Sequence, residues 1–193
     1  MTDDKDLMGE RGRSLEADYF RRRDQELLER AREQEAVAER RRQLAAALGI
    51  DDEAVVKGLV ELGVDAGTAP LLDIVPAIQV AWSDGTLPPR ERAEIERLLA
   101  RPDSQSAAKA GAPMVAEWLS RQPRPELFRL ATEALRLRAA RLNPDARTEL
   151  VTKVITDCKI VAAASGGVFG LGALSSAEAD RIRELAAALG VKS

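Results

Sequence analysis

Residues 78–91 read IQVAWSDGTLPPRE, and they combine three signals in a short space. An apolar run with helical spacing leads into an Asp-Gly pair, and a Pro-Pro-Arg-Glu run follows. This order predicts a helix, a tight glycine turn and the start of a second helix. Residues 160–178, IVAAASGGVFGLGALSSAE, repeat the pattern with five extra residues, 168–172. We therefore expect one helical hairpin used twice, in copies covering about 69–100 and 145–189.

The two copies start their second helix with different chemistry. Ser175 and Glu178 form a Ser-x-x-Glu capping box, in which each side chain accepts a backbone N–H of the other residue. Pro88 stands in place of the capping serine in the first copy, whereas Glu91 keeps the glutamate three residues later. Both arrangements predict a sharp helix start.

Glycines and capping residues divide the rest of the chain into helices. Gly49, Gly63 and Gly190 each stand between a leucine and a β-branched apolar residue, which is typical of a left-handed residue after a helix end. Asp51, Thr68 and Asn143 are predicted N-caps. The expected helices after the first 50 residues are 52–62, 69–83, 89–100, 113–121, 126–142, 145–165 and 176–189.

No stretch alternates apolar and polar residues with a period of two, so we predict no strand. Residues 101–112 contain no periodic large apolar residues and are predicted to connect the two halves. The predicted fold class is all-α: a helical bundle over residues 51–193 with an internal helix-turn-helix repeat, preceded by a long charged N-terminal helix. Residues 1–12 are predicted to be disordered, and residues 13–48 to form the helical arm.

Composition excludes several function classes. The 193 residues include no His, one Cys, two Trp, one Tyr and three Phe, with a net charge of -3. Residues that supply most catalytic bases and soft-metal ligands are nearly absent, so we predict a protein that is not an enzyme and needs no cofactor. The charge gives no positive field for nucleic acid. Cys158 has no partner for a disulfide and is expected to be a small core residue.

The first residues, MTDDKD, lack the basic and apolar segments of a secretory signal. No apolar run reaches the roughly 20 residues that a membrane helix needs. We expect a cytoplasmic protein without a membrane span.

Residues 81–92, AWSDGTLPPRER, resemble the A-x-A-D-G-x-[IVL]-x-x-x-E-[RK] signature of TerB-like tellurite-resistance domains. The resemblance covers about residues 65–190, and the second copy is a degenerate version. It implies a compact helical bundle, and it implies that Asp84 and Glu91 are the acids linked in that family with divalent metal binding. The second copy offers Gly166 in place of Asp84, and Glu178 in place of Glu91.

Two carboxylates are too few for a tight hard-cation site, which uses about six oxygens. The alternative is that Asp84 supports the Asp-Gly turn and Glu91 caps the helix. We therefore predict no bound metal.

The N-terminal arm carries ten Arg and nine Asp or Glu between residues 10 and 43, with the signs mixed. Residues 16–32, EADYFRRRDQELLERAR, resemble the inhibitory segment of mitochondrial F-type ATPase inhibitor proteins, over about 25 residues. That resemblance implies an amphipathic helix inserted at a catalytic subunit interface. The implied partner-binding residues are the apolar anchors Tyr19 and Phe20, the charged residues Glu16 and Arg21, and Leu27.

The resulting prediction is a regulatory protein that binds another protein through its N-terminal helix, with the F-type ATPase as the named candidate. If the arm instead packs on its own bundle, Tyr19, Phe20 and Leu27 would serve the fold. The alternative function is a stress-associated bundle that binds a small ligand or a divalent metal.

Overall fold

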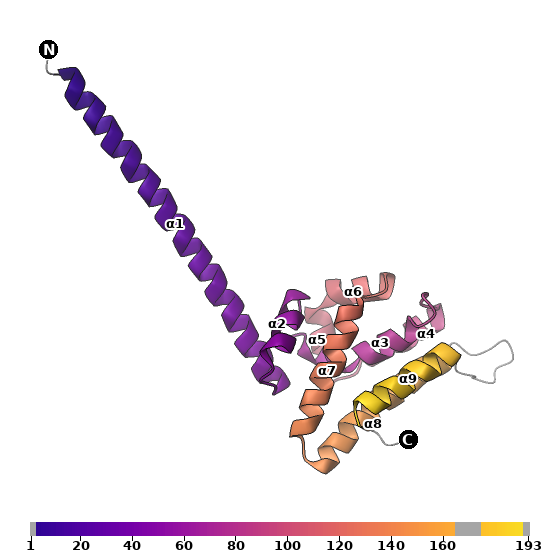
Figure 1. Cartoon of the computed structure of the whole chain (residues 1–193). Helices are drawn as coiled ribbons and strands as arrows, with labels where there is room; N and C mark the ends of the chain where they lie inside the picture. The colour runs from indigo at the N-terminus through magenta and orange to yellow at the C-terminus, as the bar shows by residue number, and fades with distance from the viewer. Residues whose placement is uncertain (1–2, 165–174, 191–193) are drawn as a thin grey trace. The chain divides into compact units, whose positions relative to one another are not determined.

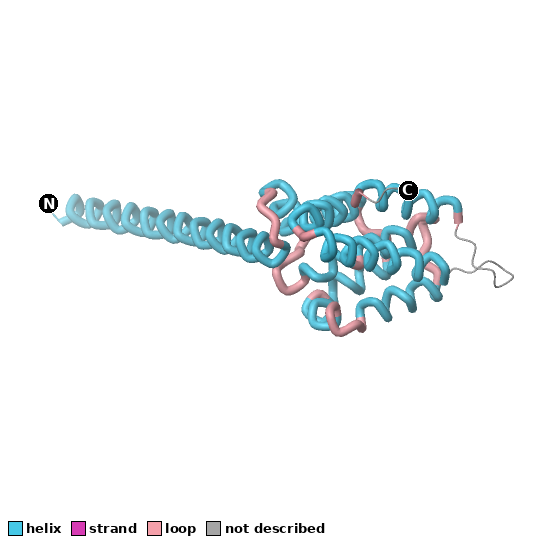
Figure 2. Tube along the Cα trace, turned by 90° about the horizontal axis from the view of Figure 1, so that it is seen from below, coloured by secondary structure: helices cyan, strands magenta, loops and turns pink. Residues whose placement is uncertain are grey.

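The computed structural model describes residues 3–164 and 175–190, with side chains described from residue 21 onward. Every regular element within these ranges is a helix, as the tube in Figure 2 shows. The all-α fold class is thereby confirmed. Among these helices, none combines the length and the apolar character that crossing a membrane would require.

The chain divides into two compact units, Met1–Arg40 and Arg41–Ser193. Helix α1 spans Asp3–Leu48, so it makes up the described part of the first unit and contributes its last turns to the second. The helix begins at Asp3, earlier than the predicted start at residue 13. An unbroken run without Gly or Pro from Arg13 to Leu48 explains its continuity.

The described part of the second unit is a bundle of helices of different lengths (Figure 1). Helix α3 has its most extensive contacts with α8 and also packs against α4, α7 and α9. The elements are α2 (Glu53–Glu61), η1 (Ala69–Asp73, a 3-10 helix), α3 (Val75–Ala81), α4 (Pro89–Leu99), α5 (Gln105–Ala110), α6 (Ala112–Ser120), α7 (Pro125–Arg141), α8 (Pro144–Ala164) and α9 (Ser176–Ala188).

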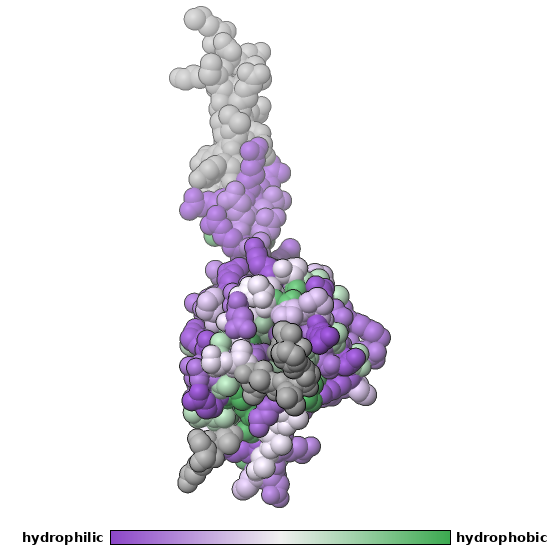
Figure 3. Space-filling model, turned by 90° about the vertical axis from the view of Figure 1, so that its right-hand side faces the viewer, coloured by the Kyte–Doolittle hydropathy of each residue, from purple (hydrophilic) through white to green (hydrophobic). Residues whose placement is uncertain are grey.

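The core of this unit draws on every part of it. Fully buried large side chains come from the last turns of α1, from α2, from η1 and α3, and from α4, α7 and α8; they include Leu44, Leu59, Leu72, Ile78, Ile95, Leu135 and Val154. On the face drawn in Figure 3, hydrophilic residues dominate the described surface and apolar residues form small separate areas. Burial of these aliphatic side chains is the main stabilising contribution.

Two predicted elements differ in the structure. The predicted helix 69–83 is divided at Ile74 into η1 and α3, and each piece has a proline at its first or second position. Pro76 has no N–H and cannot continue the hydrogen-bond ladder from η1, so a new helix starts there. The predicted connector 101–112 contains α5, whose Ala107 is buried. Small residues are enough for this helix because it packs closely on η1.

The predicted caps are partly correct. Asn143 caps α8, with Oδ1 accepting the N–H of Ala146 at 2.9 Å. The N-cap of α2 is Asp52 rather than the predicted Asp51, and its Oδ1 accepts the N–H of Val55 at 2.9 Å. Asp51 instead forms an ion pair with Arg141.

Thr68 stands at the predicted N-cap position of η1, but its hydroxyl makes no capping bond. The Thr68 hydroxyl donates to Asp65 Oδ1 at 2.9 Å and closes the preceding turn. The predicted boundary is therefore correct, although the hydroxyl has a different role.

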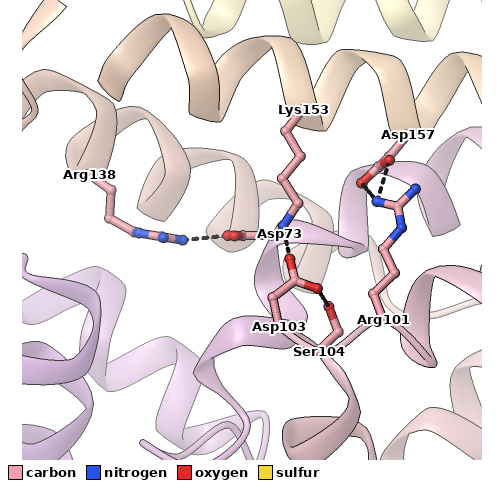
Figure 4. Close-up of polar contacts among 7 residues, drawn as sticks. All are labelled: Asp73, Arg101, Asp103, Ser104, Arg138, Lys153 and Asp157. Atoms are coloured by element: carbon pink, nitrogen blue, oxygen red, sulfur yellow. Dashed lines mark hydrogen bonds and ion pairs between the residues drawn. The ribbon is translucent and has the colours of Figure 1, made fainter. Parts of the chain in front are cut away.

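Ion pairs fix the segment between α4 and α5 onto α8 (Figure 4). Arg101 Nη1 donates to both carboxylate oxygens of Asp157, at 2.7 and 2.9 Å. Asp157 is only 3% exposed, so its carboxylate is largely shielded from water. Lys153 of α8 pairs with Asp103, whose carboxylate also accepts the Ser104 hydroxyl. The segment is thus a fixed part of the bundle.

Gly49, Gly63 and Gly190 have φ values of 65°, 85° and 78°, which confirms the three predicted left-handed helix ends. A Cβ added at Gly63 would meet no heavy atom within 4 Å, so only the backbone conformation resists substitution there. Gly63→Ala is expected to lower the free energy of unfolding by about 1 to 2 kcal/mol.

Equilibrium urea unfolding measures this loss. The matched control is Gly67→Ala, since Gly67 is not in the left-handed region and an added Cβ would make only an ordinary contact of 3.4 Å with Asp65 Oδ1. The control is expected to change stability by less than about 0.5 kcal/mol. Equal effects at the two sites would contradict the backbone explanation.

Candidate functional site

The predicted partner-binding residues lie on α1 in the first unit. Glu16, Tyr19 and Phe20 belong to the part of α1 whose side chains lie outside the described residues. Arg21 and Leu27 are described, and both are exposed. The structure thus describes the side chains of two of the five residues, and Leu27 is 53% exposed.

Leu28, next to Leu27, is 57% exposed, and these two are the most exposed large apolar side chains within the described ranges. Charged side chains occupy the neighbouring turns of the helix, with Glu26 before the pair and Arg30 after it. Leu27 and Leu28 are therefore exposed apolar side chains on an otherwise charged part of α1.

A second feature lies in the bundle, where Glu91 and Glu178 occupy the same position in two helices. Each is the third residue of its helix, Glu91 in α4 and Glu178 in α9. Glu91 is 3% exposed and Glu178 is 2% exposed. Buried carboxyl groups normally have hydrogen-bond donors nearby. The hydrogen-bond partners of Glu91 and Glu178 therefore determine how well each buried carboxyl group is stabilised.

Glu178 is fully supported by its cap. Glu178 Oε2 accepts the N–H of Ser175 at 2.6 Å, and the Ser175 hydroxyl accepts the N–H of Glu178 at 3.2 Å. This confirms the predicted capping box.

Glu91 lacks the corresponding support because its N-cap residue is Pro88, which has neither a backbone N–H nor a hydroxyl. Glu91 Oε2 is buried without a hydrogen-bond partner in the described part of the chain. Burial, together with the smaller effects of the negative charges of Glu178 and Asp84, raises the pKa of Glu91 to about 7. Glu91 therefore holds a proton across much of the acidic to neutral range.

The same residues bear on the metal role implied for Asp84 and Glu91. Within residues 3–164 and 175–190, no group of three or more His, Cys, Asp or Glu side chains is arranged to hold a metal ion. Asp84 is exposed at the turn, whereas Glu91 is buried. The turn of the second copy falls largely on residues 165–174, which lie outside the described residues.

A groove of about 610 Å³ crosses the bundle between α3, α7 and α9. Its apolar side includes Trp82, Phe128 and Leu185, which are each less than a tenth exposed. Polar residues form the rest of its lining, among them Gln79, Ser83, Gln122, Arg129, Thr132, Glu133, Arg181 and Glu184. The Ser83 hydroxyl is buried and has no hydrogen-bond partner among the described residues.

Both tryptophans are core residues, as expected from their apolar neighbours. Trp82 is 8% exposed and Trp118 is 7% exposed. Trp82 Nε1 donates to the backbone oxygen of Trp118 at 3.0 Å, which ties the end of α3 to α6. They do not form an exposed docking cluster.

Cys158 is fully buried, as predicted. Burial raises the pKa of its thiol to about 12, and the neighbouring charge of Asp157 acts in the same direction. The thiol is therefore protonated at neutral pH and is not an activated nucleophile.

Sequence reasoning missed the groove and the isolated carboxyl of Glu91. The groove combines residues from α3, α7, α9 and the segment before α7, and no local pattern relates them. The signal for Glu91 was present, since Pro88 removes the donors that a capping box needs. The missing donor makes the Glu91 carboxyl group unusual only because the structure shows that this group is buried.

No family model, curated protein or solved structure matches the chain.

Proposed function

We propose that this chain is a cytoplasmic, non-enzymatic regulatory protein that binds another protein through α1, and that its second unit is a TerB-like bundle. The observation that carries the proposal is the exposed Leu27–Leu28 pair on a charged helix. Fully burying a leucine side chain gains about 1.5 to 3 kcal/mol, so two half-exposed leucines offer a partner a useful part of that energy.

The named partner is the F-type ATPase, on the basis of the similarity of residues 16–32 to the inhibitory segment of its inhibitor proteins. In this mode Tyr19, Phe20 and Leu27 enter an apolar groove, while Glu16 and Arg21 pair with charges at its edge. A few aromatic and arginine anchors supply most of the binding energy in such interfaces. The net charge of -3 favours a protein partner over nucleic acid.

The proposal predicts that the full chain slows ATP hydrolysis by the purified F-type ATPase of the same organism. The double variant Leu27→Glu, Leu28→Glu is expected to need at least about ten times more protein for the same inhibition, equivalent to 1.4 kcal/mol of binding. The measurement is a hydrolysis rate against protein concentration.

Leu142→Glu provides the matched control, because Leu142 is 41% exposed but lies in the second unit. The control is expected to inhibit like the unchanged chain. A photo-crosslinking residue at position 28 distinguishes two parts of the proposal: that α1 binds another protein, and that this protein is the F-type ATPase. Crosslinks to another protein without inhibition would exclude the ATPase alone, whereas neither crosslinks nor inhibition would contradict binding through α1.

A second candidate function is binding of a small ligand by the bundle. It is favoured by the groove, whose volume of about 610 Å³ lies in the range of ligand sites and whose lining combines Trp82 and Phe128 with the unpartnered Ser83 hydroxyl. Thermal-shift screening of small amphipathic molecules and divalent cations tests it. If the groove is the binding site, Ser83→Ala is expected to remove the ligand-induced thermal shift, whereas a change at Leu27 is not.

A further inference from the structure

The groove of the bundle is bordered by two helices over a matching length. The lining residues of each wall lie on one face of its helix: Pro125, Arg129, Thr132 and Glu133 on α7, and Arg181, Glu184, Leu185 and Ala188 on α9. Spacings of three and four residues keep each set in line over two turns, or about 11 Å of helix axis. This length matches two turns of a third helix, with Trp82 and Phe128 beneath it.

Each wall carries an arginine that is followed about one turn later by a glutamate: Arg129 and Glu133 on α7, and Arg181 and Glu184 on α9. Both helices run toward the lower left of Figure 1, so the groove has an arginine end and a glutamate end. The two glutamates pair at the surface with arginines of their own helices, Arg136 and Arg181. Exposed pairs of this kind contribute little, so an arriving cation can compete for the glutamates.

The exposed leucine pair of α1 is set in a complementary pattern of charge. Asp24 precedes Leu27 by three residues and Leu28 by four, so it shares their helix face one turn earlier. Arg30 follows Leu27 by three residues. Arg32 follows Leu28 by four residues, so the two arginines stand at opposite edges of the face one turn after the leucines. All five side chains are exposed.

We propose that the groove binds the Leu27–Leu28 turn of α1 from a second copy of this chain. In this arrangement the two leucines cover the apolar floor, and Asp24 lies between the arginines of the two walls. Arg30 and Arg32 each face the glutamate of one wall. Arg23 also falls at the arginine end, so the glutamate end has the better charge match and is the end at which the proposal is tested.

Two observations favour a second copy as the occupant. Leu27 and Leu28 are the most exposed large apolar side chains within the described ranges, so every chain that has the groove also carries a helix that fits it. Helix α1 is unbroken from Asp3 to Leu48. Bringing the leucine pair into the groove of its own chain would therefore require a break in this helix.

The contact is head-to-tail, because α1 of one copy meets the bundle of another. Such a contact either closes reciprocally between two copies or continues along a row of copies. Two helical turns bury less surface than the roughly 1,000 Å² of a stable interface, so we expect association that is weak and depends on concentration. Docking covers Leu27 and Leu28, so a self-associated chain could not bind another protein through the same turn. Self-association would thereby regulate the binding through α1 that is proposed above.

Analytical ultracentrifugation of the full chain tests the proposal. The mean mass is expected to rise above that of the monomer between about 10 μM and 1 mM, the range of dissociation constants for weak interfaces. Two double variants each remove one half of the contact. Leu27→Glu with Leu28→Glu changes α1, and Glu133→Arg with Glu184→Arg changes the groove. Each variant alone is expected to stay monomeric over this range.

Mixing the two double variants distinguishes this contact from others. The first variant keeps an intact groove and the second keeps an intact α1, so an equimolar mixture is expected to associate through one contact per pair of chains. Glu96→Arg with Glu149→Arg is the matched control, since it makes the same change of charge at exposed glutamates outside the groove lining. This control should associate like the unchanged chain.

Three results would overturn the proposal. The first is a mean mass of the unchanged chain that stays at the monomer value up to 1 mM, which would also be the result if α1 bound the groove of its own chain. The second is association that the groove variant leaves intact, as expected for contact between two α1 helices. The third is a mixture of the two variants that fails to associate.

Discussion

Replacing Ile78 by Ala is expected to lower the free energy of unfolding by about 3 kcal/mol. Ile78 is 1% exposed and lies on α3, the helix that contacts α4, α7, α8 and α9. Removing its outer atoms leaves a cavity among four helices that cannot all move inward to fill it. The cost of this cavity therefore adds to the hydrophobic transfer free energy that the removed atoms had contributed. Equilibrium urea unfolding measures the difference.

The sequence repeat supplies the control for this experiment. Ile160 aligns with Ile78 in the repeat predicted from the sequence, but it is 39% exposed. Ile160→Ala is expected to reduce stability by less than about 1 kcal/mol, because little apolar surface returns to water. Similar losses at the two positions would mean that burial does not determine their contributions.

Arg101→Ala is expected to reduce stability by about 3 kcal/mol, at the lower end of the range for breaking a buried ion pair. The Arg101 side chain is 35% exposed, whereas that of Asp157 is only 5% exposed, so the variant leaves a carboxylate in the interior without its partner. Equilibrium urea unfolding measures the loss.

Two further variants separate charge from packing. Arg97→Ala removes an arginine whose side chain is 73% exposed, and its pair with Glu94 is expected to contribute less than about 0.5 kcal/mol. Asp157→Asn introduced together with Arg101→Ala should restore part of the loss, because the buried group is then neutral. If the double variant is no more stable than Arg101→Ala alone, the unpaired charge is not the cause.

Local rules predicted the helix boundaries well where one residue decides the outcome. Gly63 and Gly190 take the left-handed conformation that few other residues tolerate, and Ser175 with Glu178 forms the expected capping box. The division of the predicted helix 69–83 was missed because its apolar spacing continues through Ile74. The spacing of apolar residues describes only the side chains. A proline interrupts a helix through its backbone, because it lacks the N–H that the hydrogen-bond ladder needs.

The candidate sites were less predictable because they depend on burial and on distant segments. The correspondence between Glu91 and Glu178 follows from the repeat, but the absence of a donor at Glu91 matters only because the carboxyl is buried. Leu27 was chosen from its place in a recognised pattern, and its exposure required the structure. Sequence thus suggested the residues, and the structure showed how exposed or buried the described ones are.

The placement of the two tryptophans determines what optical experiments will report. Trp82 and Trp118 both belong to the unit Arg41–Ser193, where they are buried and joined by a hydrogen bond. Their fluorescence emission therefore follows water entry into the bundle, whereas far-ultraviolet circular dichroism also records the residues of α1 in the first unit. We expect the two signals to change at different denaturant concentrations, so a two-state analysis should use the emission for the bundle alone.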